Sequence, residues 1–211
     1  MTSLAPSYVL GLDLDGVVAD FYGFIRQIAA GWREVPAESL TENVSFGLGE
    51  WGFTEEEYRR LHRFAVTQCG LFQNMPVIRG AAPAIRRLAN EGVRVRVVTH
   101  RLFIDFFHRA AVEQTVQWLD SQAIPYHDLC FLADKQLVEA DIYVEDAPRN
   151  IALLQEHGKK VIAFTNSTNA TQVHSVLRAH DWAEVEQLIR ADYRAWCTHG
   201  LPSPRRVGSG R

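Results

Sequence analysis

The sequence predicts an α/β fold: a doubly wound, Rossmann-like parallel sheet with a small inserted helical cap. Three observations lead to this fold class. Short apolar runs alternate with longer stretches of helical periodicity, the order of elements that gives a parallel sheet covered by helices. Two of the helical stretches end in glycine, which favours a left-handed helix stop. One long segment after the first apolar run has no strand pattern, and this absence indicates an insertion.

The predicted strands are short apolar runs, and the predicted helices lie between them. In chain order the strands are Tyr8 to Asp13, Val93 to Thr99, Leu129 to Leu132, Ile142 to Glu145 and Val161 to Phe164. Helical periodicity covers Ala81 to Glu91, Phe107 to Gln122 and Arg149 to His157, with Gly92 and Gly158 as stop residues. We therefore expect a sheet of parallel strands with helices on both of its faces.

The inserted segment, residues 21–77, has a helical rather than a strand pattern. A helical pattern covers Phe21 to Trp32, and a looser stretch with glycines and aromatic residues surrounds Phe46 to Phe53. A charged helix follows, opened by Thr54 with Glu57 three residues on, which is the spacing of a capping box. We interpret this segment as a small helical cap over the carboxyl edge of the sheet.

The remaining residues divide into a core and a tail. Residues 1–20 and 78–198 are expected to form the α/β core, into which the cap is inserted after the first strand. Residues 199–211 are rich in Pro, Gly, Ser and Arg without periodicity, so we predict a disordered tail.

Composition excludes several classes of protein. The chain has 211 residues, 47% of them hydrophobic and 22% charged, which suits a globular domain with its own core. The 22 Lys and Arg against 25 Asp and Glu give a net charge of −3, so no positive field attracts nucleic acid. The 3 cysteines show no C-x-x-C pairing, which argues against a disulfide framework or a zinc site and favours a reducing cytoplasm. Without a signal-peptide or membrane-span pattern, we expect a cytoplasmic protein with no membrane partner.

The most informative stretch, Leu10 to Asp20, contains two aspartates two residues apart. In a strand such residues face the same side, so Asp13 and Asp15 are expected to project together where α/β sheets bind ligands. Neighbouring carboxylates repel one another, and the arrangement persists most easily around a hard cation such as Mg²⁺. A solvated Asp-Gly turn that closes the strand is the simpler alternative.

Polar residues also stand at the ends of the later predicted strands. Thr99 ends the second strand, Lys135 follows the third, and Glu145 and Asp146 come at the end of the fourth. Each has an ordinary explanation when taken alone: a strand-end threonine, a solvated lysine, or acidic residues before a helix that starts at Pro148. Their order along the chain is what makes them informative together.

In that order, these residues resemble the motifs of the haloacid dehalogenase superfamily of phosphohydrolases. The string Asp13-x-Asp15-Gly16-Val17-x-Ala19-Asp20 is similar to the first motif of the superfamily. Within the superfamily, the chain resembles the 5′(3′)-deoxyribonucleotidase family over roughly Tyr8 to Leu188. The sequence segments that carry this resemblance are Asp13 to Phe21, Phe72-Gln73-Asn74-Met75-Pro76, and Asp134-Lys135 followed by Ala140-Asp141-Ile142.

The resemblance implies a Mg²⁺-dependent phosphomonoesterase that works through an aspartyl-phosphate, most simply a 5′-nucleotidase of (deoxy)ribonucleoside monophosphates. Asp13 is then the nucleophile, Asp15 the acid and base, and Thr99 and Lys135 the phosphate ligands. The implied metal ligands are Asp13, Asp146 and Asp15, the last through its backbone carbonyl, with Glu145 just behind them. Phe21, Phe72 and His100 are the implied substrate contacts, and a homodimer is a family expectation.

The sequence also departs from the family pattern. Glu145 stands where the family usually has aspartate, and His100-Arg101 stands where it usually has Ser-Pro, which leaves the nucleotide preference open. Phe72 also fits a simple core position, because aromatic residues on amphipathic helices are more often buried. Two other functions remain: a capped phosphatase for another small phosphomonoester, such as a sugar phosphate or biosynthetic intermediate, and a non-catalytic phospholigand-binding domain. A pure binder needs no nucleophile, so the complete set of residues argues against the second.

Overall fold

A six-stranded, all-parallel sheet in the order β3-β2-β1-β4-β5-β6 organises the protein. The computed structural model describes residues 7–103, 107–171 and 177–198. The strands are β1 (Val9–Leu12), β2 (Arg94–Thr99), β3 (Asp128–Phe131), β4 (Ile142–Glu145), β5 (Val161–Phe164) and β6 (Leu177–Ala179). The predicted doubly wound parallel sheet is confirmed. The edge strand β6 was not predicted, because three residues are too few to show an alternating pattern.

Seven helices and three short 3₁₀ turns accompany the sheet in the described part of the chain. They are α1 (Phe21–Arg33), α2 (Glu55–Gln68), α3 (Leu71–Asn74), α4 (Ala81–Asn90), α5 (His108–Ser121), α6 (Pro148–Glu156), α7 (Trp182–Thr198), η1 (Ala37–Ser39), η2 (Gly49–Trp51) and η3 (Lys135–Leu137). The helices predicted between the strands are confirmed to within a residue or two. Gly92 and Gly158 have φ angles of +102° and +68°, so both predicted left-handed stops are present.

The strand order places a topological switch point beside β1. From β1 the chain proceeds to β2 and β3 on one side, whereas β4, β5 and β6 extend on the other. Right-handed crossovers that run in opposite directions put α4 and α6 on opposite faces of the sheet. Ligands of open α/β sheets bind outside the carboxyl ends of the strands at such a point, and this is the edge where β1 and β4 end.

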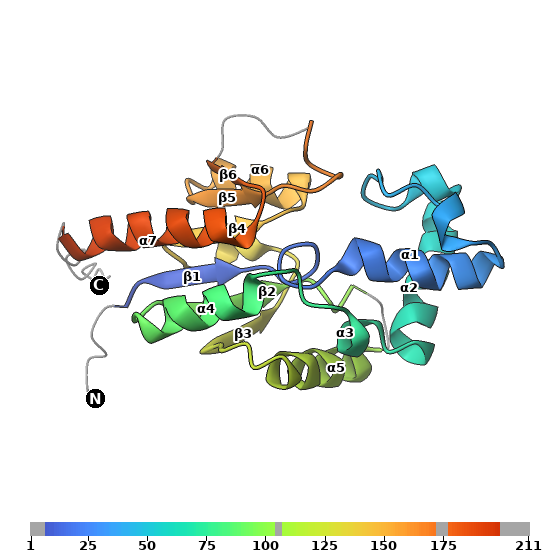
Figure 1. Cartoon of the computed structure of the whole chain (residues 1–211), viewed down its shortest axis with the longest axis horizontal. Helices are drawn as coiled ribbons and strands as arrows, with labels where there is room; N and C mark the ends of the chain where they lie inside the picture. Colours follow the sequence, from blue (N-terminus) through green and yellow to red (C-terminus); the bar gives the residue numbers. More distant parts are fainter. Residues whose placement is uncertain (1–6, 104–106, 172–176, 199–211) are drawn as a thin grey trace, which may run out of the picture.

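The inserted segment lies beyond that edge. Figure 1 shows α1 and α2 past the carboxyl end of β1. The chain leaves and returns side by side, because the Asp20 amide donates to the Pro76 carbonyl at 2.8 Å and the Ile78 amide donates to the Val18 carbonyl at 2.8 Å. The capping box at the start of α2 is present, with Thr54 and Glu57 bonded reciprocally.

The exact division into core and cap stays a prediction, and the predicted tail, residues 199–211, lies outside the described residues. Among the helices that the structure describes, none combines the length and the apolar character that crossing a bilayer requires.

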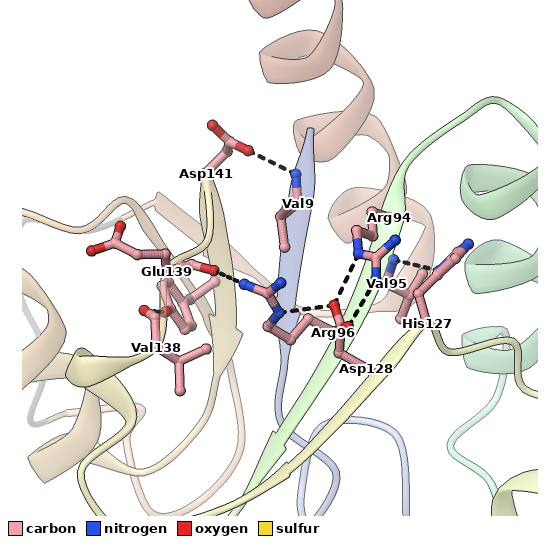
Figure 2. A network of polar contacts seen from close by, with 10 residues as sticks. Val9, Arg94, Val95, Arg96, His127, Asp128, Val138, Glu139 and Asp141 are labelled. Carbon is pink, nitrogen blue, oxygen red and sulfur yellow. Dashed lines mark hydrogen bonds and ion pairs between the residues drawn. The ribbon is translucent and has the colours of Figure 1, made fainter. Parts of the chain in front are cut away.

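The amino-terminal edge of the sheet, opposite the switch point, is tied together by charged side chains (Figure 2). Arg94 donates to both carboxylate oxygens of Asp128, at 3.0 and 2.8 Å, and Nε of Arg96 donates to the same carboxylate at 3.0 Å. The Val9 amide donates to the Asp141 carboxylate at 2.7 Å. These contacts join β2 to β3, and the start of β1 to the residue before β4, at the edge opposite the candidate site.

Candidate active site

Three buried carboxylates meet at the carboxyl edge of the sheet. Asp13 directly follows β1, Glu145 ends β4, and Asp146 follows it; one oxygen from each lies within 4.8 Å of the others. The Asp13 amide donates to the Val144 carbonyl at 3.1 Å, which continues the pairing of β1 with β4 up to the site. The fold therefore concentrates negative charge where it has little water to disperse it.

One buried cation faces this carboxylate cluster. Nζ of Lys135, in η3, lies 2.7 Å from Oδ1 of Asp13 and 2.6 Å from Oε2 of Glu145. Oε1 of Glu145 accepts hydrogen bonds from the amides of Asp146 and Ala147 at 3.2 and 3.1 Å. Burial works against the charge of Lys135, but attraction to Asp13 and Glu145 outweighs it and raises the Lys135 pKa. One lysine against three carboxylates still leaves an excess of negative charge.

The donor set fits a divalent cation. Burial raises the pKa of Asp146 to about 8, and repulsion from Glu145 adds to the effect. Burial and the Glu145 charge also raise the pKa of Asp13 well above its ordinary value, although Lys135 opposes them. Carboxylate oxygens are the ligands that Mg²⁺ prefers, and a doubly positive ion would offset the repulsion that raises both pKa values. Asp13 and Asp146 are therefore suited to hold such an ion.

The loop after β1 fits tightly against this cluster. Gly16 has a φ of +80°, and a Cβ on it would lie 2.2 Å from Oδ2 of Asp146, so no other residue fits without displacing that carboxylate. The same Oδ2 accepts a hydrogen bond from Nδ2 of Asn166 at 2.7 Å. The sequence analysis did not predict Asn166 as a site residue. Its position could have indicated this role, because it is a polar residue two positions after the end of β5, at the same edge of the sheet.

Thr99 ends β2, the strand next to β1, and its side chain is buried with 1% of the residue exposed. Its Oγ1 has no hydrogen-bond partner among the described residues. An unpaired buried hydroxyl costs about 1–3 kcal/mol, so native structures seldom keep one unless a ligand or water completes it. An oxyanion bound at this edge could accept the missing hydrogen bond.

Among the described residues, the Asp15 carboxylate is not one of the three that meet within 4.8 Å of one another. Its two oxygens accept hydrogen bonds from Nη2 and Nε of Arg101 at 2.7 and 3.0 Å. The alternation of a strand does not extend to Asp15, because β1 ends at Leu12. Asp15 thus pairs with Arg101, whereas Asp13 pairs with Lys135. The sequence marked Arg101 only as a departure from the family pattern.

The implied substrate contacts differ in exposure. Phe21 is buried beside His62, with ring centroids 6.1 Å apart, whereas His100 is exposed. Phe72 is only 1% exposed, and its ring packs against the Arg101 guanidinium at 4.4 Å, so this ring occupies a core position. Burial lowers the pKa of His62 to about 4, which keeps that imidazole neutral near pH 7. Direct contact of Phe21, Phe72 and His100 with a substrate stays a prediction.

Solved structures of low sequence identity share this fold. A predicted phosphatase from Clostridium acetobutylicum is 13% identical, with a TM-score of 0.60, and the match covers 89% of this chain and 100% of that one. A haloacid dehalogenase-like family hydrolase from Streptococcus pneumoniae is 11% identical, with a TM-score of 0.59, over 87% of this chain and 98% of the other. The chain thus shares the fold of these haloacid dehalogenase-like structures.

Sequence comparison narrows the family further. Residues 7–195 match the model of the family described as "5' nucleotidase, deoxy (Pyrimidine), cytosolic type C protein". The chain is 54% identical to a Chlorobaculum tepidum protein named "Putative 5'(3')-deoxyribonucleotidase" over 186 residues, 88% of this chain and 91% of that protein. A Bordetella pertussis protein of the same name is 29% identical over 65% of this chain and 73% of its own length. The chain belongs to the cytosolic type C 5′ nucleotidase family, and it is a phosphoric monoester hydrolase.

Proposed function

We propose that the protein is a Mg²⁺-dependent 5′-nucleotidase that removes phosphate from (deoxy)ribonucleoside monophosphates through an aspartyl-phosphate on Asp13. The observation that carries this proposal is the buried group of Asp13, Lys135 and Asp146 at the same sheet edge as the unpaired hydroxyl of Thr99. A nucleophile, a fixed positive charge and an unused hydrogen-bond donor at one sheet edge are what transfer of a phosphoryl group requires.

The proposed first step forms a bond between the Asp13 carboxylate and phosphorus, while the bond from phosphorus to the leaving alcohol breaks. Asp15 gives its proton to that alcohol oxygen. In the second step Asp15 takes a proton from water, whose oxygen attacks phosphorus and restores the Asp13 carboxylate. Lys135 and Thr99 stabilise the phosphoryl oxygens through charge and a hydrogen bond.

Asp13, Asp146 and the backbone carbonyl of Asp15 are the groups we expect to hold Mg²⁺. The bound cation supplies charge neutralisation, so that an anionic nucleophile can approach an anionic phosphate. Glu145 touches Lys135 and two backbone amides, which suits it to orient the lysine rather than to bind the metal.

The relatives support a nucleotide as the substrate, because the Chlorobaculum and Bordetella proteins are both named "Putative 5'(3')-deoxyribonucleotidase". The exposed His100 and the largely buried Phe21 lie near the same edge and are the proposed contacts to the nucleoside. A cytoplasmic location and assembly as a homodimer belong to the same proposal.

Phosphate release from a panel of 5′- and 3′-nucleotides and sugar phosphates tests this function, with either Mg²⁺ or EDTA present. We expect Mg²⁺-dependent release concentrated on nucleoside monophosphates and absent in Asp13→Asn. Asp120→Asn, an exposed aspartate on α5, is the matched control and should act like the wild type. Wild-type turnover by folded Asp13→Asn would contradict the mechanism, whereas release centred on sugar phosphates would contradict the substrate class alone.

A further inference from the structure

Arg101 is a buried cation close to the proposed site but outside the carboxylate cluster. It follows Thr99 by two residues, and its side chain has no exposed surface, at 0%. An arginine next to a phosphate-binding threonine would ordinarily be interpreted as a second phosphate ligand. The contacts of the guanidinium argue for a different role.

All three guanidinium nitrogens donate to partners within the protein. Nε and Nη2 hold the two oxygens of Asp15 at 3.0 and 2.7 Å, and Nη1 donates to Oγ1 of Thr115 at 3.1 Å. Thr115 is itself fixed, because its hydroxyl donates to the Ala111 carbonyl at 2.6 Å on α5. The guanidinium thus spans from α5 to the loop after β1.

Two aromatic rings enclose the same guanidinium. The ring of Phe72, from α3 of the inserted segment, lies 4.4 Å from the Arg101 Cζ, and the ring of Trp118, from α5, lies 5.7 Å from it. Such contacts restrict the planar group to one orientation. Because the Arg101 side chain has no exposed surface, lies between two rings and already donates three of its five N–H groups within the protein, it is poorly placed to bind a substrate phosphate.

We propose that Arg101 is a positioning residue that orients the carboxylate of Asp15 for its proton transfers. This inference rests on the proposed function. Asp15 stands on a loop, and its side chain is 25% exposed. Among the contacts of the described residues, only the Arg101 guanidinium holds both of its carboxylate oxygens. Each carboxylate oxygen has a second lone pair, which remains available to the reacting groups. Small misplacements of a catalytic group cost about 10²-fold in rate, so this orientation is consequential.

The test compares two leaving groups in Arg101→Met and Arg101→Lys. A nucleoside 5′-monophosphate releases an alkoxide that needs a proton, whereas p-nitrophenyl phosphate releases a stable phenolate that does not. We expect Arg101→Met to lower kcat on the nucleotide by about 10²-fold, the usual size of a general acid contribution. On p-nitrophenyl phosphate the burst of p-nitrophenolate, which reports the first step alone, should keep its rate constant within about threefold, because with this leaving group only the second step needs Asp15. Arg101→Lys keeps the positive charge but cannot hold both Asp15 oxygens as the planar guanidinium does. It should therefore restore only part of the kcat on the nucleotide.

Arg94→Met is the matched control, because Arg94 also holds an aspartate through two hydrogen bonds but at the opposite edge of the sheet. It should leave both rates unchanged. An equal loss in the rate of leaving-group release in the first step on the two substrates, or a raised KM with constant kcat on the nucleotide, would overturn the positioning role while leaving the proposed function intact. A wild-type enzyme that releases no phosphate would overturn both. If Arg101→Met does not fold, as judged by circular dichroism, the leaving-group comparison in Arg101→Lys decides the question.

Discussion

Replacing Lys135 with methionine removes the only cation that contacts the carboxylate cluster within the described structure. Its Nζ lies 2.7 Å from Asp13 and 2.6 Å from Glu145, and all three side chains are buried. Methionine preserves most of the volume of the side chain but none of its charge or hydrogen bonds. In the absence of a bound divalent cation, three carboxylates would then face one another without compensation.

The size of the effect follows from two opposing quantities. Two unit charges about 4 Å apart attract by about 4 kcal/mol at an effective dielectric constant of about 20, so the two pairs together lose about 8 kcal/mol. The variant regains several kcal/mol, because no ammonium group has to be desolvated on folding. We therefore expect a net loss of about 3–5 kcal/mol, the range found when one partner of a buried pair is removed. For a chain of this length that corresponds to a fall in Tm of roughly 10 °C.

Urea unfolding in EDTA measures this loss, with Lys160→Met as the control. Lys160 lies 2.6 Å from Asp192, the same short separation, but its side chain is 61% exposed. An exposed pair contributes about 0–1 kcal/mol, so the control should remain close to the wild type. Mg²⁺ should recover part of the Lys135→Met loss, since it supplies positive charge at the same place. Equal stability of the two variants in EDTA would refute the account of the cluster given above.

Three further predictions concern the proposed metal site, the amino-terminal edge of the sheet and the start of α2. Mg²⁺ at 100 times its Kd should stabilise the wild type by about 2.7 kcal/mol, measured by thermal unfolding. Asp146→Asn should abolish this stabilisation, and a variant that Mg²⁺ stabilises as much as the wild type would exclude Asp146 as a ligand. Hydrogen bonds from Arg94 lower the pKa of Asp128 to about 2, so its contribution to stability is complete above its unfolded value near 4 and is lost as the pH falls toward 2. The gap in urea midpoint between wild type and Asp128→Asn should accordingly narrow between about pH 5 and pH 2, and a constant gap would contradict this. Thr54→Ala should lower the unfolding free energy by about 1 kcal/mol through loss of the α2 cap, without changing kcat.

The fold and the main candidate residues could be predicted from the sequence for a local reason. Short apolar runs and helical periodicity are properties of neighbouring residues, and they identified five of the six strands. Because parallel strands end at one edge of a sheet, residues that follow those runs had to approach one another. The family resemblance marked Asp13, Thr99 and Asp146 as site residues, and all three stand at that edge.

The pairing of charges could not be predicted in the same way. Lys135 could have been a solvated lysine, and only its burial between Asp13 and Glu145 makes it the counter-charge of the cluster. Asn166 contacts Asp146 across 20 positions of sequence, and Arg101 reaches Asp15 across 86.

The sequence by itself determined which groups stand at the strand ends, because strand and helix patterns depend on local order. Only the tertiary structure decided that Asp13 faces Lys135 whereas Asp15 faces Arg101. The physical reason is that β1 ends before either aspartate, so the direction of each carboxylate follows from the charges and rings packed around it. Those neighbours come from η3, β4, α3 and α5. These elements are distant from Asp13 and Asp15 in the sequence and approach them only when the chain folds.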